Sequence, residues 1–205
     1  MRVHEMIARY YPQYYSIETY DCGNVARVHK IDGDWGIFSN FANTPLYVEG
    51  KTFDTSERLF QVLKMSTKEA QTSVFEVKGN PKMIARHIAK VTPEQIRPDW
   101  PEIIVDVMKF CLMTKYEQCA EFRDVLVRSQ GMVIVEGQTT FPRKNADTWG
   151  VKLKDGKYVG PQSFGSAADG AAGGWGTGLF DPGRDAGSIA YARGSDNRKL
   201  FSFFI

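Results

Sequence analysis

The chain has 205 residues, of which 42% are hydrophobic and 24% are charged, and its formal net charge at pH 7 is +2. This composition is typical of a globular protein that buries a substantial core, and it excludes an intrinsically disordered chain. A nonspecific DNA-binding protein is usually more basic, so the charge gives no support to that class. The length fits one domain, with or without an appendage.

Cysteines are few and irregularly spaced. Cys22, Cys111 and Cys119 are an odd number and lack the CxxC spacing of a zinc site, so we expect neither a metal site nor a disulfide scaffold. A reduced, cytoplasmic environment is the corresponding expectation. Residues 1–15 lack the apolar segment of a secretory signal, and no apolar run is long enough to cross a bilayer, so we expect no membrane partner. No P-loop or G-x-G-x-x-G motif opens a helix after a strand, and no cofactor is expected.

Extended segments come first in the chain. Residues 25–31, VARVHKI, alternate as a strand does. Residues 46–53, LYVEGKTF, predict a short hairpin with its turn at Glu49 and Gly50. Residues 55–65, TSERLFQVLKM, then predict a helix.

Further helices are expected in the middle of the chain. Residues 79–91, GNPKMIARHIAKV, predict one with Asn80 as N-cap and Pro81 at the first helical position. Residues 99–118 repeat apolar side chains at helical spacing, which indicates a core-facing helix. Residues 119–129 predict another short helix.

The last part of the chain changes character. Residues 132–137, MVIVEG, predict a buried strand. Residues 151–160, VKLKDGKYVG, carry Asp155 and Gly156, the favoured pair for a two-residue hairpin turn. Residues 162–205 are rich in Gly, Ala and Ser without a helical or strand period, so an irregular tail is expected.

A polar stripe marks the helix of residues 55–65, for which Ser56 is the expected N-cap. Gln61 lies about 40° and Lys64 about −20° around the helix from Glu57, whereas the other sides are mostly apolar. One interpretation is structural: a paired network, or a solvated stripe with Glu57 and Lys64 loosely paired. The other is a carboxylate lining a cleft, where it acts as a general base or stabilises a developing cation.

The sequence contains five blocks in a fixed order, and the ordered set is a more specific signal than any single block. The first two are the G-x-F-S-N-F of WGIFSNF and the T-x-E-x-x-x-Q-x-x-K of TSERLFQVLK, with a G-K-x-F segment between them. NPKMIARHIAK and DWPEIIVDVMKFCLMTKYEQ follow as helices, and a D-x-W-G at residues 147–150 follows Glu136. Over residues 28–161 the blocks resemble the NADAR family, also called YbiA-like.

The resemblance implies an organisation into three parts. Residues 1–27 are expected to be an N-terminal extension, residues 28–161 a NADAR-like N-glycosidase domain, and residues 162–205 an atypical tail. The expected fold is mainly α, a single compact helical domain with short β hairpins. The chain departs from the family at Arg58, where members usually carry His or a similar residue, and at its end, which lacks the usual closing helix.

The resemblance also implies a reaction, the hydrolysis of an N-glycosidic bond to a ribosylated base. Its substrates would be ADP-ribosyl-guanine, as for an ADP-ribosylglycohydrolase, or a ribosylaminopyrimidine phosphate of riboflavin biosynthesis. Because the transition state resembles an oxocarbenium ion, carboxylates are suited to the chemistry. Glu57 and Asp147 are therefore the expected catalytic acids, with acid and base unassigned, and Lys64 is the expected amine beside them.

Further residues are expected to bind substrate: Phe38, Ser39, Asn40, Phe41, Gln61, Arg86, Trp100, Trp149 and Gly150. Flat side chains among them would stack on a base, and Arg86 would grip a phosphate. Five of them have a structural alternative: core packing for Phe38 and Phe41, a hydrophobic helix cap for Trp100, a turn or cap for Asn40, and a solvated charge for Arg86.

Two other functions remain open from the sequence. The first is a module that binds ADP-ribose or a nucleotide without turnover, which the missing closing helix favours. The second is an inactive product of an altered reading frame. The expected partner is a small nucleotide or an ADP-ribosylated nucleic acid, and a toxin–antitoxin context is compatible with either.

Overall fold

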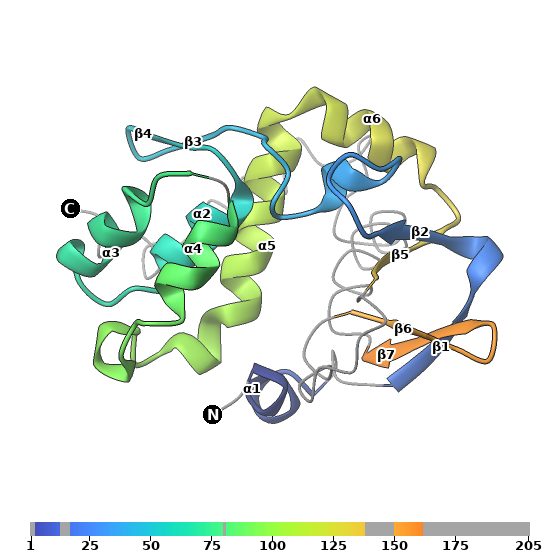
Figure 1. Ribbon diagram of the computed structural model, residues 1–205, viewed down its shortest axis with the longest axis horizontal. Coiled ribbons are helices and arrows are strands. Elements are labelled where there is room, and N and C mark those ends of the chain that lie inside the picture. The colour runs from blue at the N-terminus through green and yellow to red at the C-terminus, as the bar shows by residue number, and fades with distance from the viewer. Residues whose placement is uncertain (1–2, 13–16, 80, 138–149, 162–205) are drawn as a thin grey trace, which may run out of the picture. The chain divides into compact units, whose positions relative to one another are not determined.

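The computed structural model describes residues 3–12, 17–79, 81–137 and 150–161 (Figure 1). Contacts between Cα atoms divide the chain into two compact units. Of the described residues, Asn40–Phe122 form one unit, here the helical unit, and the residues on either side of that range form the other, here the strand unit. The chain therefore departs from the expected single compact helical domain.

The helical unit consists of a hairpin followed by helices. Its elements are β3 (Leu46–Val48), β4 (Lys51–Phe53), α2 (Ser56–Leu63), α3 (Lys68–Phe75), α4 (Pro81–Ile88), a 3-10 turn (Pro93–Gln95) and α5 (Trp100–Gln118). Helix α2 contacts α3, α4 and α5, which makes it the central helix of this unit. Leu59 and Leu63 of α2 and Val107 of α5 are almost fully buried and belong to its core.

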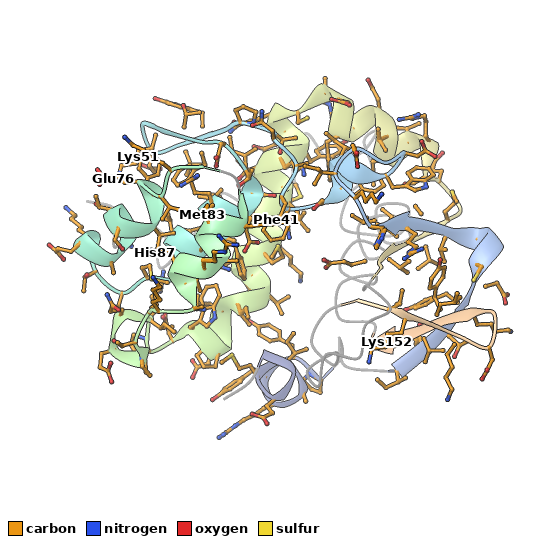
Figure 2. All side chains as sticks on the ribbon, in the orientation of Figure 1. Phe41, Lys51, Glu76, Met83, His87 and Lys152 are labelled. Atoms are coloured by element: carbon orange, nitrogen blue, oxygen red, sulfur yellow. The ribbon has the colours of Figure 1, made fainter. Side chains whose placement is uncertain are left out.

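Helices α3 and α4 are joined by a polar contact as well as by packing. Ser73 Oγ of α3 lies 3.2 Å from Nε2 of His87 on α4. Figure 2 labels His87 and, one turn earlier on the same helix, Met83. Helix α4 begins at Pro81 as predicted, whereas its expected N-cap, Asn80, lies outside the described residues. Helix α3 has no counterpart among the sequence-based expectations.

The strand unit is built around two sheets. Its elements are α1 (Val3–Tyr10), β1 (Ile17–Asp21), β2 (Val25–Val28), β5 (Val133–Glu136), β6 (Lys152–Lys154), β7 (Lys157–Pro161), and 3-10 turns at Cys22–Asn24 and Gly36–Phe38. Strands β2 and β5 form a parallel pair in which Val25 lies opposite Val133. The antiparallel sheet has the order β1-β7-β6 (Figure 1). The division between the units falls within α6 (Ala120–Arg128).

Both predicted hairpins are confirmed. Glu49 and Gly50 have φ of 47° and 76°, and Asp155 and Gly156 have φ of 51° and 78°. Two consecutive residues with positive φ are the mark of the type I′ turn, whose twist suits adjacent antiparallel strands. The pairing of Val48 with Lys51 and of Lys154 with Lys157 closes each turn over two residues.

The expectation of a mainly α fold is met only in part. The predicted helices and hairpins are present, but β1 and the parallel β2–β5 pair add strand structure. Strand β1 lies within the expected N-terminal extension and pairs with β7 along its length. The tail expected at residues 162–205 lies outside the described residues. None of the described helices combines the length and apolar character that crossing a membrane requires.

Candidate active site

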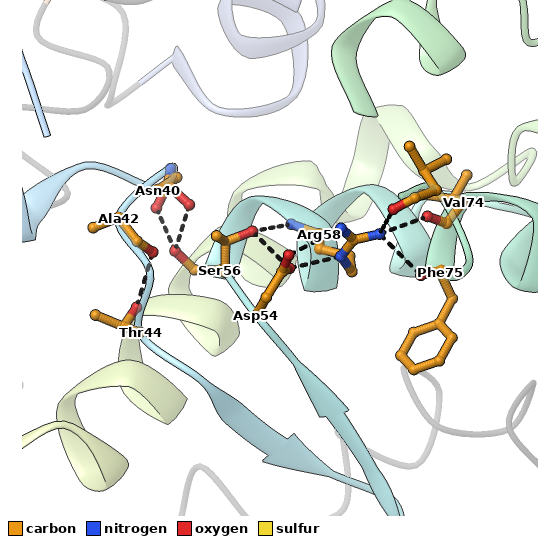
Figure 3. Close-up of polar contacts among 10 residues, drawn as sticks. Asn40, Ala42, Thr44, Asp54, Ser56, Arg58, Val74 and Phe75 are labelled. Carbon is orange, nitrogen blue, oxygen red and sulfur yellow. Dashed lines mark hydrogen bonds and ion pairs between the residues drawn. The ribbon is translucent and has the colours of Figure 1, made fainter. Parts of the chain in front are cut away.

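The first turn of α2 is held by residues on both sides of the hairpin. Thr55, rather than the expected Ser56, is the N-cap, and its Oγ1 accepts a hydrogen bond from the Arg58 amide at 3.1 Å. The Asn40 carbonyl accepts the Glu57 amide at 3.0 Å. Ser56 Oγ donates to Asn40 Oδ1 at 3.0 Å (Figure 3). These bonds satisfy helix-terminal groups that otherwise lack partners, and they fix the backbone from which Glu57 projects.

The polar stripe of α2 is a connected group. Gln61 Nε2 donates to Glu57 Oε1 at 2.9 Å. Lys64, one turn further on, is the C-cap residue of the helix. All three side chains belong to half-buried residues. Gln61 Oε1 is buried and has no hydrogen-bond partner among the described residues.

Burial controls the protonation of the two charged members of the stripe. It raises the pKa of Glu57 above its ordinary value of 4.5, and outweighs the lowering by the Gln61 hydrogen bond and by the charge of Lys64. Burial also lowers the pKa of Lys64 from 10.5, which the negative charge of Glu57 only partly offsets. Both shifts favour the neutral forms of the two side chains.

The stripe faces α5. Burial, and secondarily the charge of Glu57, raise the pKa of the Cys111 thiol well above its ordinary value of 9.0. Cys111 therefore stays a protonated, buried thiol and is not a nucleophile. Met108, one turn earlier on α5, lies with its Sδ 3.5 Å from Asn40 Nδ2, which donates to it. Both ends of the Asn40 side chain thus have protein partners.

The aromatic candidates lie in different surroundings. Phe38 stacks on Trp35, with ring centroids 6.0 Å apart, and packs against a buried cluster of the strand unit. Trp100 is only 3% exposed and meets Phe60 of α2 edge-on at 5.1 Å. Phe41, labelled in Figure 2, is half-buried in the helical unit. Phe41 therefore retains some accessible surface in the unit that contains Glu57.

The remaining candidates are spread over both units. Arg86 is exposed on α4, where its Nη1 lies 3.5 Å from Met83 Sδ. Ser39, in the strand unit, is half-buried, and its amide donates to the Gly36 carbonyl at 3.0 Å. Gly150 is buried, with a φ of 102° that favours glycine. Asp147 and Trp149 lie outside the described residues.

Arg58 was not among the expected site residues, yet its side chain joins α2 to residues at and after the end of α3. Its Nε and Nη2 donate to the two carboxylate oxygens of Asp54 at 2.6 and 2.9 Å. Its Nη1 donates to the carbonyls of Val74, Phe75 and Val77, beyond or at the end of α3. The spacing of four residues between Asp54 and Arg58 is typical of an ion pair on a helix and can be recognised in the sequence. The hydrogen bonds of Arg58 to the carbonyls at the end of α3 cannot be recognised there.

Metal ligands do not gather in the described part of the chain. No group there of three or more His, Cys, Asp or Glu side chains is placed to hold an ion.

Comparison with known proteins places this arrangement in a family. The model of the NADAR domain matches residues 28–167. The N-glycosidase YbiA of Escherichia coli K12 is 31% identical over 112 residues, which cover 55% of this chain and 69% of that protein. The N-glycosidase Npun_R5314 of Nostoc punctiforme is 24% identical over 114 residues, or 55% and 72% of the two chains.

A solved structure agrees with the sequence matches. The NMR structure of E. coli YbiA superposes with a TM-score of 0.53 at 31% identity, covering 62% of this chain and 71% of that one. The fold is thus YbiA-like. The domain match spans more than half of the chain, and it includes α2 with its polar stripe. The chain therefore belongs to the NADAR domain family.

Proposed function

We propose that this protein is an N-glycosidase that hydrolyses the bond between ribose and a base. The observation that carries the proposal is the carboxyl of Glu57, half-buried, with a raised pKa, and in contact with Gln61 and the charge of Lys64. Carboxyl groups in such surroundings are typical of sites that move protons. Two relatives are named N-glycosidases, which supports cleavage of an N-glycosidic bond as the reaction of this carboxyl.

The reaction requires a carboxylate at the anomeric carbon. As the C–N bond breaks, the base leaves with the bonding electrons and positive charge develops on the sugar. Glu57 stabilises that charge, and it accepts a proton from the water whose oxygen bonds to the anomeric carbon. The departing base takes up a proton, for which Asp147 is the proposed second acid.

Gln61 is suited to both protonation states of Glu57. Its Nε2 donates to the ionised carboxylate, while its Oε1 has no partner among the described residues. Rotation of the amide by half a turn would present Oε1 to a protonated Glu57 as an acceptor. In this proposal Gln61 holds the carboxyl in one place while its proton comes and goes.

Lys64 supplies the balancing charge. Its ammonium favours ionised Glu57, whereas burial of both groups favours their neutral forms. Burial and the mutual attraction of the two charges therefore act in opposite directions on the ionisation of the pair. Lys64 thereby lets Glu57 act as a base without making it a permanently ionised carboxylate.

The proposed binding residues supply stacking and anchoring. Phe38, Phe41 and Trp149 would stack on the base, and Arg86 would meet a phosphate from its exposed position. Asn40 and Trp100 would act from behind α2, by fixing the Glu57 amide and by packing against Phe60. Ser39 and Gly150, both in the strand unit, are proposed binding residues from the family blocks alone. These assignments follow the family blocks.

Two substrates fit the proposal. One is guanine carrying ADP-ribose, in DNA, which would suit a toxin–antitoxin context. The other is a ribosylaminopyrimidine phosphate of riboflavin biosynthesis. Both present a ribose joined through nitrogen to a heterocycle, together with phosphate, so the same carboxyl chemistry serves either.

Product analysis in isotopically labelled water tests the proposal. The protein is incubated with each substrate, and the free base and released sugar are identified by mass spectrometry. Hydrolysis predicts base and sugar in equal amounts, with one heavy oxygen from water in each sugar. Saturable binding without release would instead support a nucleotide-binding module, and absence of both would remove the proposal for these substrates.

A further inference from the structure

A cation lies on one of the two apolar faces of the β2–β5 pair. Arg27 follows Val25 by two residues on β2, so alternation along the strand puts both side chains on the same face. That face carries a buried cluster of Val25, Val135 and Val151, against which Tyr20 and Tyr158 pack. A guanidinium in such surroundings requires an explanation, because charges are rarely buried without a partner.

The guanidinium of Arg27 has no polar partner in the described part of the chain. Its Nε–H is buried and donates to no acceptor there, and no hydrogen bond or ion pair of the side chain occurs among those residues. The guanidinium lies over the ring of Tyr158, with Arg27 Cζ 5.4 Å from the ring centroid. A cation over a tyrosine ring is favourable, but it leaves the N–H groups unsatisfied.

Two contacts with described residues cover parts of the guanidinium. A Cβ added at Gly137 would collide with Arg27 Nε, so the glycine is what allows the side chain to pass. Gly137 thus covers Nε, and the Tyr158 ring covers one flat face of the guanidinium. Arg27 as a whole is only half-buried. Among the described residues, neither of these two contacts involves the edge that carries the two terminal nitrogens.

The imidazole of His29 lies at the same glycine as the Arg27 guanidinium. His29 Nδ1 is 3.3 Å from the Gly137 carbonyl oxygen, and His29 is exposed. The lysines of the neighbouring sheet do not share this position. Lys152 on β6 lies opposite Val159, whereas Tyr158 lies opposite Leu153, so alternation directs Lys152 to the other face (Figure 2).

We infer that Arg27 is an anion site that binds a phosphate group through its two terminal nitrogens. The parallel N–H groups of arginine match two oxygens of a phosphate, and the doubly charged group neutralises the cation more fully than a carboxylate does. The phosphate is either inorganic or carried by a sugar or nucleotide. This inference uses only residues of the strand unit and holds whether or not the proposed glycosidase activity does.

Calorimetric titration and thermal unfolding of the full chain test the inference. Inorganic phosphate, pyrophosphate, ribose phosphate and AMP are the probes, with acetate and matched sodium chloride as controls. Wild-type protein should bind at least one of the phosphates saturably and unfold at a higher temperature in its presence. The pattern across the four probes identifies whether the phosphate is free or carried.

Two substitutions locate the site. Arg27→Met should weaken phosphate binding by about tenfold to a hundredfold, as expected for loss of charge-assisted hydrogen bonds. Arg27→Lys keeps the charge but not the paired N–H groups, so it should bind with intermediate affinity. The matched control, Lys152→Met, removes a cation from the same unit and should bind as wild type does.

The unfolding temperature of the unliganded Arg27→Met variant provides a second, independent test. A cation without a protein partner contributes little to folding, so this variant should unfold at the wild-type temperature or above it. A clear drop would mean that the guanidinium already has a structural partner, which overturns the inference. Unchanged phosphate affinity in Arg27→Met, binding of acetate alone, or no saturable binding by wild type would overturn it too.

Discussion

Replacement of Arg58 by methionine should destabilise the protein by removing the link between α2 and the end of α3. The side chain is only 7% exposed, and it holds α2 to the end of α3. It makes a two-pronged ion pair with Asp54 and donates at 3.3, 2.9 and 2.8 Å to the carbonyls of Val74, Phe75 and Val77 (Figure 3). Val74 and Phe75 belong to the last turn of α3, where helix carbonyls lack intrahelical partners, and the Val77 amide also donates to the Val74 carbonyl at 3.4 Å.

The magnitude follows from what the substitution leaves behind. Loss of one partner of a buried ion pair costs about 3–5 kcal/mol, because the remaining charge and acceptors stay desolvated. Asp54 is 42% exposed and can regain water, and Phe75 and Val77 are only half-buried. We therefore expect the lower end, a loss of about 3 kcal/mol from the free energy of unfolding, against a usual total of about 5–15 kcal/mol.

Urea denaturation at neutral and acidic pH measures the effect. Burial alone would raise the pKa of Asp54, but the hydrogen bonds and charge of Arg58 outweigh it and lower the pKa below 3.8. The stability from this pair is thus complete above the unfolded pKa and is lost as pH falls through the folded one. The difference between wild type and Arg58→Met should shrink at acidic pH.

A surface arginine provides the control for this experiment. Arg86→Gln on α4 changes an exposed side chain, and it should alter the free energy of unfolding by no more than about 0.5 kcal/mol. A loss below about 1 kcal/mol for Arg58→Met, with the denaturant slope unchanged, would refute the assignment of Arg58 as the link between α2 and α3.

Three further substitutions probe the buried titratable groups. The pKa of Glu57 in the folded protein is raised above 4.5, so the folded protein loses stability as pH rises from 4.5 through that raised pKa. Glu57→Gln should therefore unfold at or above the wild-type temperature at pH 7. Below pH 4.5 this difference should disappear. Gln61→Leu removes the donor to the Glu57 carboxylate, so the acidic limb of the pH–activity profile should move to higher pH; an unmoved limb would exclude this role for Gln61. Burial lowers the pKa of Lys115 from 10.5 to about 8, so the unfolded chain binds more protons between these values and the stability of wild type relative to Lys115→Met should rise with pH across that interval, as urea denaturation would show.

Local sequence patterns predicted the parts of the fold that local chemistry determines. Glu49–Gly50 and Asp155–Gly156 predicted both hairpin turns, since few residue pairs tolerate two positive φ values in succession. Pro81 predicted the start of α4, since its ring suits the first helical position. The hydrogen bond between Glu57 and Gln61 matches the common face predicted for them from their spacing of four residues.

The rest depends on residues that are distant in the sequence. The parallel pairing of β2 with β5 joins residues more than a hundred positions apart, and nothing in either strand's own pattern specifies its partner. The Asn40 carbonyl that accepts the Glu57 amide is likewise invisible to periodicity, because any residue type supplies a carbonyl. Thr55 rather than Ser56 caps α2 for a similar reason: both side chains can cap, and backbone geometry decides between them.

The most direct test of the glycosidase proposal is the rate of base release by Glu57→Gln in a single turnover, with enzyme in excess over labelled substrate. Glu76→Gln, an exposed carboxylate in the same unit and labelled in Figure 2, is the matched control. Loss of a general base predicts a rate about a hundredfold or more below wild type for Glu57→Gln, with substrate affinity retained, and a wild-type rate for Glu76→Gln. A Glu57→Gln rate within a few fold of wild type would contradict the assignment of Glu57 as the catalytic carboxylate.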